Sequence, residues 1–240
     1  MDPDEAYSAQ RFRDDFLRIH GEITARGGLP LLVGGAGMYL TAVAEGFMAI
    51  PGHSAARLAE VRAELADCDD RAIRRRLAAA DRKAHDRIHP RDRRRSQRAL
   101  EIFLVSGRTV TELQEMQRVD PAAGLGFPTF VLERTVGELD ERIAARTEAM
   151  LAAGWIEETR ELLARHRADG PGLASIGYRE IVRHLQGGLA RTELAPVVVR
   201  ATRQYAKRQR TWFRHVEASW RGRPDDPVLP GLVLAELGAS

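Results

Sequence analysis

The sequence predicts an α/β protein whose parallel sheet is interrupted by an all-helical insertion. A short apolar run at residues 31–33 is followed by a glycine turn at 34–37 and then by apolar residues at helical spacing. That is the order of a strand–turn–helix unit. Residues 54–118 show helical spacing throughout, and a second short apolar run at 127–132 returns to strand character. Strands on either side of a purely helical stretch indicate one α/β core that carries an insertion.

The composition narrows the class of protein further. Of the 240 residues, 44% are hydrophobic, which is enough for a sizeable core. The chain contains no run of about 18 apolar residues, so no transmembrane helix is expected. The first five residues are polar and acidic, which excludes a secretory signal at this end. Cys68 is the single cysteine, so an internal disulfide is excluded and a cytoplasmic location is expected.

The N-terminal half is expected to form mostly helices. We predict a helix over residues 4–26, the strand at 31–33, and a helix from the glycine turn to about Phe47. Several helices should follow between 54 and 118, with an interruption at 87–90 because the residue before a proline leaves the helical region readily.

Local signals mark helix ends in this stretch. Ser54 is a plausible N-cap, and Thr109 with Glu112 fits a capping box. Ser106 and Gly107 read as the end of the preceding helix.

The C-terminal half returns to mixed structure. The expected elements are a strand at 127–132, a helix or helix pair at 138–167, helices at 175–185 and 192–219, and a last strand at 228–234. Gly154 is the position at which the long helix would divide into two.

Positive charge is concentrated although the net charge is only +3. The stretch from Arg71 to Arg98 holds twelve Arg or Lys residues against three Asp, and Arg200 to Arg214 holds six against none. Concentrated cations in a nearly neutral protein indicate a polyanionic partner. The alternative is an arginine-rich composition on solvated helices.

No motif in these 240 residues identifies a catalytic centre by itself. The sequence Gly-x-x-x-x-Gly-Lys-Ser/Thr of a phosphate-binding P-loop does not occur, and the glycines at 34–37 fit a tight turn better than an anion site. His85 and His89 have the i, i+4 spacing of zinc ligands, but a third ligand is not evident, so no metal site is predicted.

Arg142 and Arg146 lie one turn apart on the helix that follows the second strand. Two guanidinium groups so placed could clamp a diphosphate or stabilise a leaving group. The alternative is that they pair with Glu138, Asp140 or Glu141 on the same helix.

Basic and aromatic residues alternate along the last long helix. Arg203, Lys207, Arg210 and Arg214 share one stripe, and three aromatic residues accompany them: Tyr205, Trp212 and Phe213. Such a helix could hold phosphates and stack on bases, or its aromatic residues could be core and its stripe solvated.

Four stretches, in this order, match one family. They are Val-Gly-Gly-Ala-Gly-Met-Tyr-Leu at 33–40, Arg-Ile-His-Pro-Arg-Asp-Arg-Arg-Arg-Ser-Gln-Arg-Ala-Leu-Glu at 87–101, Ile-Gly-Tyr-Arg-Glu at 176–180, and Thr-Arg-Gln-Tyr-Ala-Lys-Arg-Gln-Arg-Thr-Trp-Phe-Arg at 202–214. Together they resemble the tRNA dimethylallyltransferase, or tRNA isopentenyltransferase, family over roughly residues 2–220.

The resemblance implies a fold and a reaction. The fold is a P-loop kinase-like α/β core, here residues 1–50 and 127–240, with a helical tRNA-binding insertion at 51–126. The reaction transfers a dimethylallyl group from dimethylallyl diphosphate to N6 of adenosine 37 beside the anticodon, with the adenosine flipped out of its stack. The resemblance also implies a P-loop of the nucleotide-binding (ATP-binding) type and Mg²⁺ as cofactor. It implies tRNA as the partner, no association with a membrane, and a monomeric protein.

Site residues follow from the resemblance by position. Arg146 matches the arginine that faces the diphosphate, and Gly35, Ala36 and Gly37 match the mouth of the substrate channel. The residues that match tRNA contacts are Arg94, Arg95, Ser96, Gln97, Arg98, Ala174, Ser175, Ile176, Gly177, Tyr178, Arg179, Lys207, Arg208, Gln209, Arg210, Thr211, Trp212, Phe213 and Arg214.

Two departures from the family pattern matter. Ala36 stands where the family usually has a threonine that touches the tRNA. The family's P-loop, most of its Mg²⁺ ligands and its general-base aspartate precede the position of Asp2, so these 240 residues alone are expected to be inactive. A misplaced start codon, a split gene and a degenerate paralogue are the alternatives, and a non-catalytic tRNA-binding remnant is the rival function. A relative of the nucleotide kinases is a weaker third reading.

Overall fold

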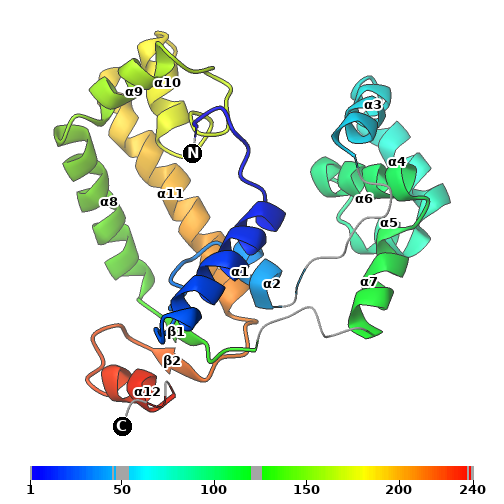
Figure 1. The fold of residues 1–240 in the computed structure, drawn as a ribbon. Coiled ribbons are helices and arrows are strands. Elements are labelled where there is room, and N and C mark those ends of the chain that lie inside the picture. The colour runs from blue at the N-terminus through cyan, green and yellow to red at the C-terminus, as the bar shows by residue number, and fades with distance from the viewer. Residues whose placement is uncertain (1, 45, 47–53, 120–125, 237, 239–240) are drawn as a thin grey trace. The chain divides into compact units, whose positions relative to one another are not determined.

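A computed structural model describes residues 2–44, 46, 54–119, 126–236 and 238. The chain divides into two compact units, shown in Figure 1. Unit 1 comprises Met1–Ala44 and Gly126–Ser240, and unit 2 comprises Glu45–Leu125. The sequence places the boundaries at 50/51 and 126/127, and this division falls at 44/45 and 125/126. None of the helices in the described ranges is long and apolar enough to cross a bilayer.

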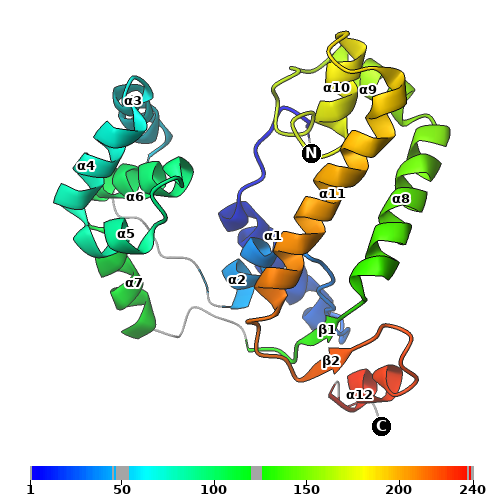
Figure 2. The same cartoon turned by 180° about the vertical axis from the view of Figure 1, so that it is seen from behind.

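Unit 1 is mostly helical. Its elements are α1 (Ala9–Ala25), α2 (Gly37–Ala44), β1 (Phe130–Leu132), α8 (Val136–Ala152), α9 (Trp155–Leu163), α10 (Tyr178–Leu185), α11 (Arg191–Phe213), β2 (Trp220–Gly222) and α12 (Leu229–Glu236). The long helix α11 runs between α8 on one side and α1 and α2 on the other, as Figures 1 and 2 show. The predicted division of the long helix at Gly154 is confirmed by the separate helices α8 and α9.

The core of unit 1 joins the C-terminal end of α8, the helices α9 and α10, and the N-terminal half of α11. Its most buried members are the apolar side chains that recur at helical spacing, namely Leu151, Trp155, Ile156, Ile181, Leu189, Leu194 and Val198. Burying a side chain of this size contributes about 1.5–3 kcal/mol each. This packing holds the C-terminal part of α11 in a defined position, although that part has few buried residues of its own.

The α/β class is confirmed by a parallel pair of strands. Phe130 pairs with Trp220 and Leu132 pairs with Gly222 in a parallel register. The prediction of a strand at 31–33 is wrong. These residues form no strand, and Leu31 and Val33 are 71% and 81% exposed. A parallel strand needs neighbours for its backbone and cover for both faces, and the described residues pair β1 with β2 only.

The C-terminal tail also differs from the prediction. Residues 228–234 were expected to form a strand, but α12 covers most of them, beginning with Leu232 N–H donating to the carbonyl of Val228. A short apolar run fits a strand or a buried helix equally well by periodicity. The second strand of the structure is β2, with the sequence Trp-Arg-Gly. This sequence has no strand pattern, and the segment is a strand because it pairs with β1.

The segment before α1 is extended. The helix begins at Ala9 and not at residue 4, because Ser8 adopts an extended conformation and its Oγ accepts the N–H of Arg11 at 3.1 Å. Asp4 accepts the N–H of Arg167 at 3.0 Å, and Pro3 accepts the N–H of Gly172 at 2.8 Å. The first residues are therefore tied to the loop that follows α9.

Unit 2 is wholly helical where it is described, as predicted. Its helices are α3 (Ala55–Ala66), α4 (Asp70–Ala80), α5 (Arg82–Arg87), α6 (Arg93–Ser106) and α7 (Val110–Val119). The Ser54 cap and the Thr109–Glu112 capping box are both confirmed, with backbone-to-side-chain distances of 2.7–3.1 Å. Val61, Leu65, Ile73 and Leu100 form its main core.

A buried carboxylate joins three elements of unit 2. Asp81 is 5% exposed, and its Oδ1 caps α5 by accepting the N–H of Ala84 at 2.9 Å. It also accepts the N–H and the hydroxyl of Thr111 at 3.0 and 2.7 Å. Both carboxylate oxygens are thus used, which makes a buried charge tolerable.

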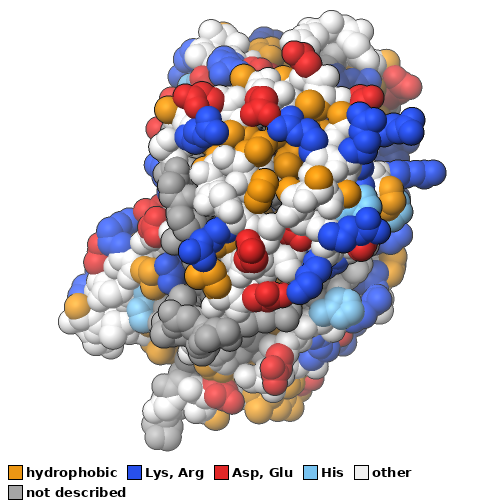
Figure 3. Space-filling view, turned by 90° about the vertical axis from the view of Figure 1, so that its right-hand side faces the viewer, with side chains coloured by type: hydrophobic (Ala, Val, Ile, Leu, Met, Phe, Trp, Pro, Cys, Tyr) orange, Lys and Arg blue, Asp and Glu red, His pale blue; other side chains and the backbone are white. Residues whose placement is uncertain are grey.

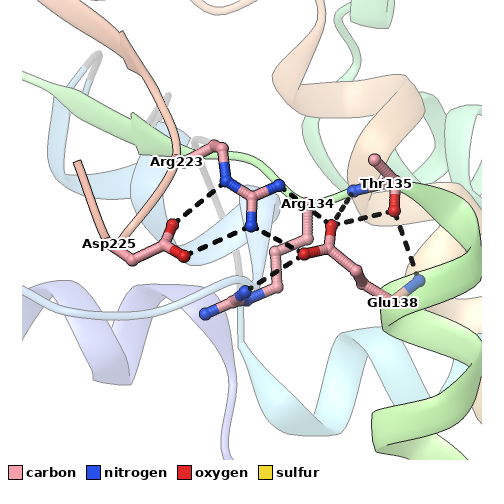
Figure 4. A network of polar contacts seen from close by, with 5 residues as sticks. All are labelled: Arg134, Thr135, Glu138, Arg223 and Asp225. Carbon is pink, nitrogen blue, oxygen red and sulfur yellow. Dashed lines mark hydrogen bonds and ion pairs between the residues drawn. The ribbon is translucent and has the colours of Figure 1, made fainter.

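A polar network fixes the tail of unit 1 to the start of α8 (Figure 4). Arg223 donates to both oxygens of Glu138, at 2.7 and 3.2 Å, and to Asp225. Glu138 also completes a capping box with Thr135, and Arg134 lies 3.6 Å away. The hydrogen bonds from Arg223 and Thr135 lower the pKa of Glu138 to about 2.

Candidate functional site

The glycine turn lies against the C-terminal part of α11. Gln209 Nε2 donates to the carbonyl oxygen of Gly35 at 2.8 Å. A Cβ at Gly37 would overlap the indole ring of Trp212. Glycine is therefore required at Gly37 for close approach and not for an unusual backbone angle. The structure brings together the predicted channel mouth and the predicted tRNA-contacting helix, which are separated by more than 160 positions in sequence.

Aromatic packing holds the other side of this turn. The hydroxyl of Tyr39 in α2 donates to the carbonyl of Tyr7 at 3.0 Å, and the Tyr39 ring stacks on Phe12 at 4.6 Å. Tyr7 in turn donates to Asp15 at 2.8 Å, and partial burial together with this carboxylate raises the pKa of Tyr7. The turn is thus held between α1 and α11.

The aromatic residues of α11 divide into two kinds. Trp212 lies on Gly37 and meets Phe213 edge-to-face at 4.7 Å, so both rings pack within unit 1. Tyr205 is exposed, with the guanidinium of Arg208 5.5 Å from the centre of its ring. The interpretation of the aromatic residues as core therefore holds for Trp212 and Phe213. Tyr205 is the ring that remains accessible to a base.

The alternative of local pairing for Arg142 and Arg146 is not observed. Neither has an ion-pair partner in the described part of the chain, and both are exposed. Asp140 pairs instead with Arg203 of α11 at 3.1 Å, and Glu138 is occupied by Arg223. Two unneutralised guanidinium groups one turn apart remain on α8.

Three further cations, two on α11 and one directly after it, are also unneutralised within the described ranges. Lys207, Arg210 and Arg214 are exposed and have no acidic partner there. Figure 3 shows many exposed Lys and Arg side chains on the face in view, several of them gathered toward one edge. Exposed cations of this kind attract phosphate groups.

Residues 174–177 form a compact turn before α10, and Tyr178 and Arg179 begin that helix. The N–H of Gly177 donates to Glu180 Oε2 at 2.7 Å, and a Cβ at Gly177, where φ is +94°, would overlap the Trp155 ring. Tyr178 donates to Glu158 at 2.7 Å, and its partial burial and this carboxylate raise its pKa. In this segment Ala174, Ser175 and Arg179 are exposed, whereas Gly177 is buried and Ile176 and Tyr178 are half-buried.

The predicted segment in unit 2 divides in a similar way. Arg94 is exposed without an ion-pair partner in the described residues, and Arg95 lies 3.5 Å from Asp92. Gln97 and Arg98 both donate to Glu101, at 3.1 and 3.2 Å. These are the side chains that an RNA could reach, Arg94 most directly.

Ser96 needs a correction. Its side chain is completely buried, so it cannot touch an RNA in this structure. Its hydroxyl instead receives a hydrogen bond from Arg74 at 3.4 Å. Arg74 also donates to the carbonyl oxygens of Ile88 and His85, at 3.0 and 2.8 Å. Nothing in the spacing of the basic stretch indicates that Arg74 turns inward to make these contacts.

The residues that the structure describes do not form a Mg²⁺ site. Among the described residues, one group of three side chains, Asp2, Asp4 and His166, has ligand atoms close enough to share an ion. Mg²⁺ prefers six oxygen ligands in near-octahedral geometry, whereas this group offers a histidine nitrogen. Both carboxylates also accept backbone N–H groups here, those of Asp4 and Arg167. His85 and His89, which have the spacing of zinc ligands, make different contacts. His85 faces Asp86, and His89 accepts the N–H of Arg91.

Comparison with known proteins identifies relatives of the whole chain. A family model described as IPP transferase matches residues 1–216. A tRNA dimethylallyltransferase of Alkalilimnicola ehrlichii is 42% identical over 217 residues, which are 89% of this chain and 68% of that protein.

Solved structures agree on the fold. A tRNA isopentenylpyrophosphate transferase from Bacillus halodurans is 30% identical with a TM-score of 0.65, and the match covers 99% of this chain and 76% of that one. The Staphylococcus epidermidis transferase is 24% identical with a TM-score of 0.64, over 100% and 79% of the two chains. A eukaryotic dimethylallyltransferase acting on tRNA is 23% identical with a TM-score of 0.78, over 98% and 62%. The Staphylococcus epidermidis and eukaryotic structures are under 25% identical to this chain, so they show likeness of fold only.

Proposed function

Because this chain belongs to the IPP transferase family, a family of transferases, we propose that it serves the transfer of a dimethylallyl group to N6 of adenosine 37 in tRNA. In that reaction the N6 nitrogen forms a bond to the allylic carbon of dimethylallyl diphosphate. The bond from that carbon to oxygen breaks, and the diphosphate leaves with the electron pair. A base removes the surplus proton from N6.

The contact between the glycine turn and α11 is the observation that carries this proposal. Gly35 and Gly37 lie directly against Gln209 and Trp212, and exposed cations flank the same helix. We assign the turn to the mouth of the channel in which a flipped adenosine meets the donor. Lys207, Arg210 and Arg214 would then hold phosphates of the RNA beside that mouth.

Arg146, with Arg142 one turn before it, would face the donor's diphosphate. Charge builds on the leaving oxygen as the bond to carbon breaks, and a guanidinium stabilises that charge more in the transition state than in the ground state. The absence of an acidic partner in the described residues supports this assignment, since a neutralised guanidinium would contribute less.

We also propose that these 240 residues bind tRNA but transfer the dimethylallyl group poorly by themselves. They contain no Gly-x-x-x-x-Gly-Lys-Ser/Thr sequence to hold the diphosphate, and no residue of the described site matches the family's general base. Loss of a general base alone costs about 10²–10⁴-fold in rate. A cytosolic location and a monomeric state complete the proposal.

The test combines two measurements on this chain. An anticodon stem-loop hairpin should bind, with an affinity that falls as salt rises, because phosphate contacts release counterions. Incubation with dimethylallyl diphosphate and tRNA should give little or no prenylated adenosine. Robust turnover would show that another base and phosphate site operate, and absence of tRNA binding would refute the proposed function.

The second candidate is a tRNA-binding protein without catalytic activity, because the unpartnered cations Lys207, Arg210 and Arg214 would serve RNA binding alone equally well. The codons upstream of Met1 discriminate the two. An in-frame P-loop motif there indicates the enzyme, and a stop codon directly upstream indicates the binding protein.

A further inference from the structure

Arg142 and Arg146 lack an ion-pair partner in the described chain, and one carboxylate decides this. Side chains three or four positions apart on a helix can pair. Within α8, Glu138 is the single acidic residue at that spacing from either arginine, four positions before Arg142. A glutamate that precedes its cation by four positions also has the favourable orientation. Glu138 would therefore pair with Arg142 if its carboxylate were available.

The Glu138 carboxylate is instead held by a residue of the C-terminal tail. Arg223 donates to Oε1 and Oε2 of Glu138 at 2.7 and 3.2 Å. Oε2 also accepts the N–H and the hydroxyl of Thr135, at 2.9 and 2.8 Å. In Figure 4 the carboxylate lies between Arg223 and Thr135. Both oxygens are thus occupied by groups other than Arg142.

Arg223 is itself fixed in place. Its Nε and Nη2 donate to the two carboxylate oxygens of Asp225, at 3.1 and 3.2 Å. It directly follows β2, whose Gly222 pairs with Leu132 shortly before α8 begins at Val136. Arg223 also lies beyond residues 1–216, the span that the family model matches, so the resemblance assigns it no role.

The capping box by itself would not occupy the whole carboxylate. Thr135 uses Oε2, whereas Oε1 has Arg134 at 3.6 Å besides Arg223. Without Arg223, the two carboxylates of the network in Figure 4 would face one cation of that network, Arg134. A further guanidinium would then be attracted to Oε1, and the long side chain of Arg142 is the one at pairing distance on the same helix.

We propose that Arg223 is a positioning residue that holds Glu138 and so keeps Arg142 available to bind, together with Arg146, the diphosphate of the donor. This rests on the proposed function, which places the diphosphate at these two arginines. A guanidinium that is paired with a carboxylate must give up that contact to bind a phosphate, so its contribution to anion binding falls. Arg223 acts through Glu138 and does not itself touch the diphosphate.

The experiment is a double-mutant cycle of Arg223→Gln and Glu138→Gln. The probe is inorganic diphosphate at low salt, and arginine side-chain NMR signals report its dissociation constant. Glutamine at position 138 keeps the shape of the side chain and can still complete a capping box. The matched control is Arg167→Gln, because Arg167 makes the same two contacts to Asp169, at 3.1 and 3.0 Å, and has no ion pair with α8 in the described residues. Thermal melts verify that every variant is folded.

Arg223→Gln should weaken diphosphate binding about twofold to fivefold, the range of one exposed ion pair. Glu138→Gln should bind at least as tightly as the unmodified chain, and adding Arg223→Gln to it should cause no further loss. An equal loss in both backgrounds would mean that only net charge matters and would overturn the proposal. Unchanged affinity in Arg223→Gln, or the same loss in Arg167→Gln, would also overturn it.

A second measurement separates the role of Arg223 from the proposed function. Phenylglyoxal modifies the neutral form of a guanidine group, and an adjacent carboxylate favours the charged form, so pairing slows the modification. Modification of Arg142, located by mass spectrometry, should be slower in Arg223→Gln and should recover in the double variant. An unchanged rate would overturn the hold of Arg223 on Glu138. If the rate changes as expected but Arg142→Gln binds diphosphate as tightly as the unmodified chain, the diphosphate site of the proposed function is refuted instead.

Discussion

Gln209 in α11 donates to the carbonyl oxygen of Gly35, 174 positions earlier in the chain, at 2.8 Å. The bond fixes a glycine turn that has no secondary structure of its own to a helix anchored in the core of unit 1. The residues that the proposed reaction needs at its channel mouth are therefore positioned by α11.

Gln209→Ala should lower the free energy of unfolding by about 0.5–1.5 kcal/mol, because one hydrogen bond to a half-buried carbonyl is lost. Urea titration monitored by circular dichroism measures this change. Gln204→Ala is the control, since Gln204 is exposed on the same helix without a hydrogen-bond partner in the described residues. If both variants lost equal stability, the bond to Gly35 would not be the cause.

Gly37→Ala should destabilise the chain by about 1–3 kcal/mol, because the new methyl group overlaps the Trp212 ring and one of them must move. Alanine is the better helix former, so helix propensity predicts the opposite sign. Gly34→Ala is the matched control, since a Cβ there meets nothing within 4 Å. A stabilised Gly37→Ala variant would contradict the close approach.

Ala36→Thr should stabilise α2 by about 0.5–2 kcal/mol. Ala36 occupies the N-cap position, where its carbonyl accepts the N–H groups of Tyr39 and Leu40 but its side chain has no acceptor. A threonine hydroxyl supplies one. Ala36→Val has nearly the same shape without the hydroxyl, so the difference between the two variants in thermal melts isolates the cap. No difference would show that the amides are already satisfied.

Glu138 makes stability depend on pH in acid. Its pKa is lowered to about 2 in the folded chain by Arg223 and Thr135, and an unfolded glutamate titrates near 4.3. The resulting stabilisation is present above the unfolded pKa and is lost as pH falls toward the folded one. Unfolding free energies measured from about pH 5 to pH 2 should fall more steeply in the unmodified chain than in Glu138→Gln.

Glu141→Gln is the control for that measurement, since Glu141 is exposed on the same helix and has no ion-pair partner in the described residues. It should follow the unmodified chain. Parallel curves for Glu138→Gln and the unmodified chain would mean that the network in Figure 4 does not persist in solution.

Local sequence determined much of this protein by itself. The all-helical character of 54–118, the Ser54 cap, the Thr109–Glu112 capping box and the division at Gly154 each depend on neighbouring residues, and each is confirmed. The family was equally readable, because four separate motifs kept their order.

Tertiary structure decided the remainder. Residues 31–33 form no strand and β2 forms from Trp-Arg-Gly, because a strand exists only where a partner supplies hydrogen bonds. Ser96 and Arg74 turned inward while Arg71, Arg75 and Arg91 have no side-chain partner in the described residues, and all of them looked alike as members of one basic stretch. Which cation finds a partner depends on the packing of α3 to α7, and that packing is not encoded in the spacing of the charges.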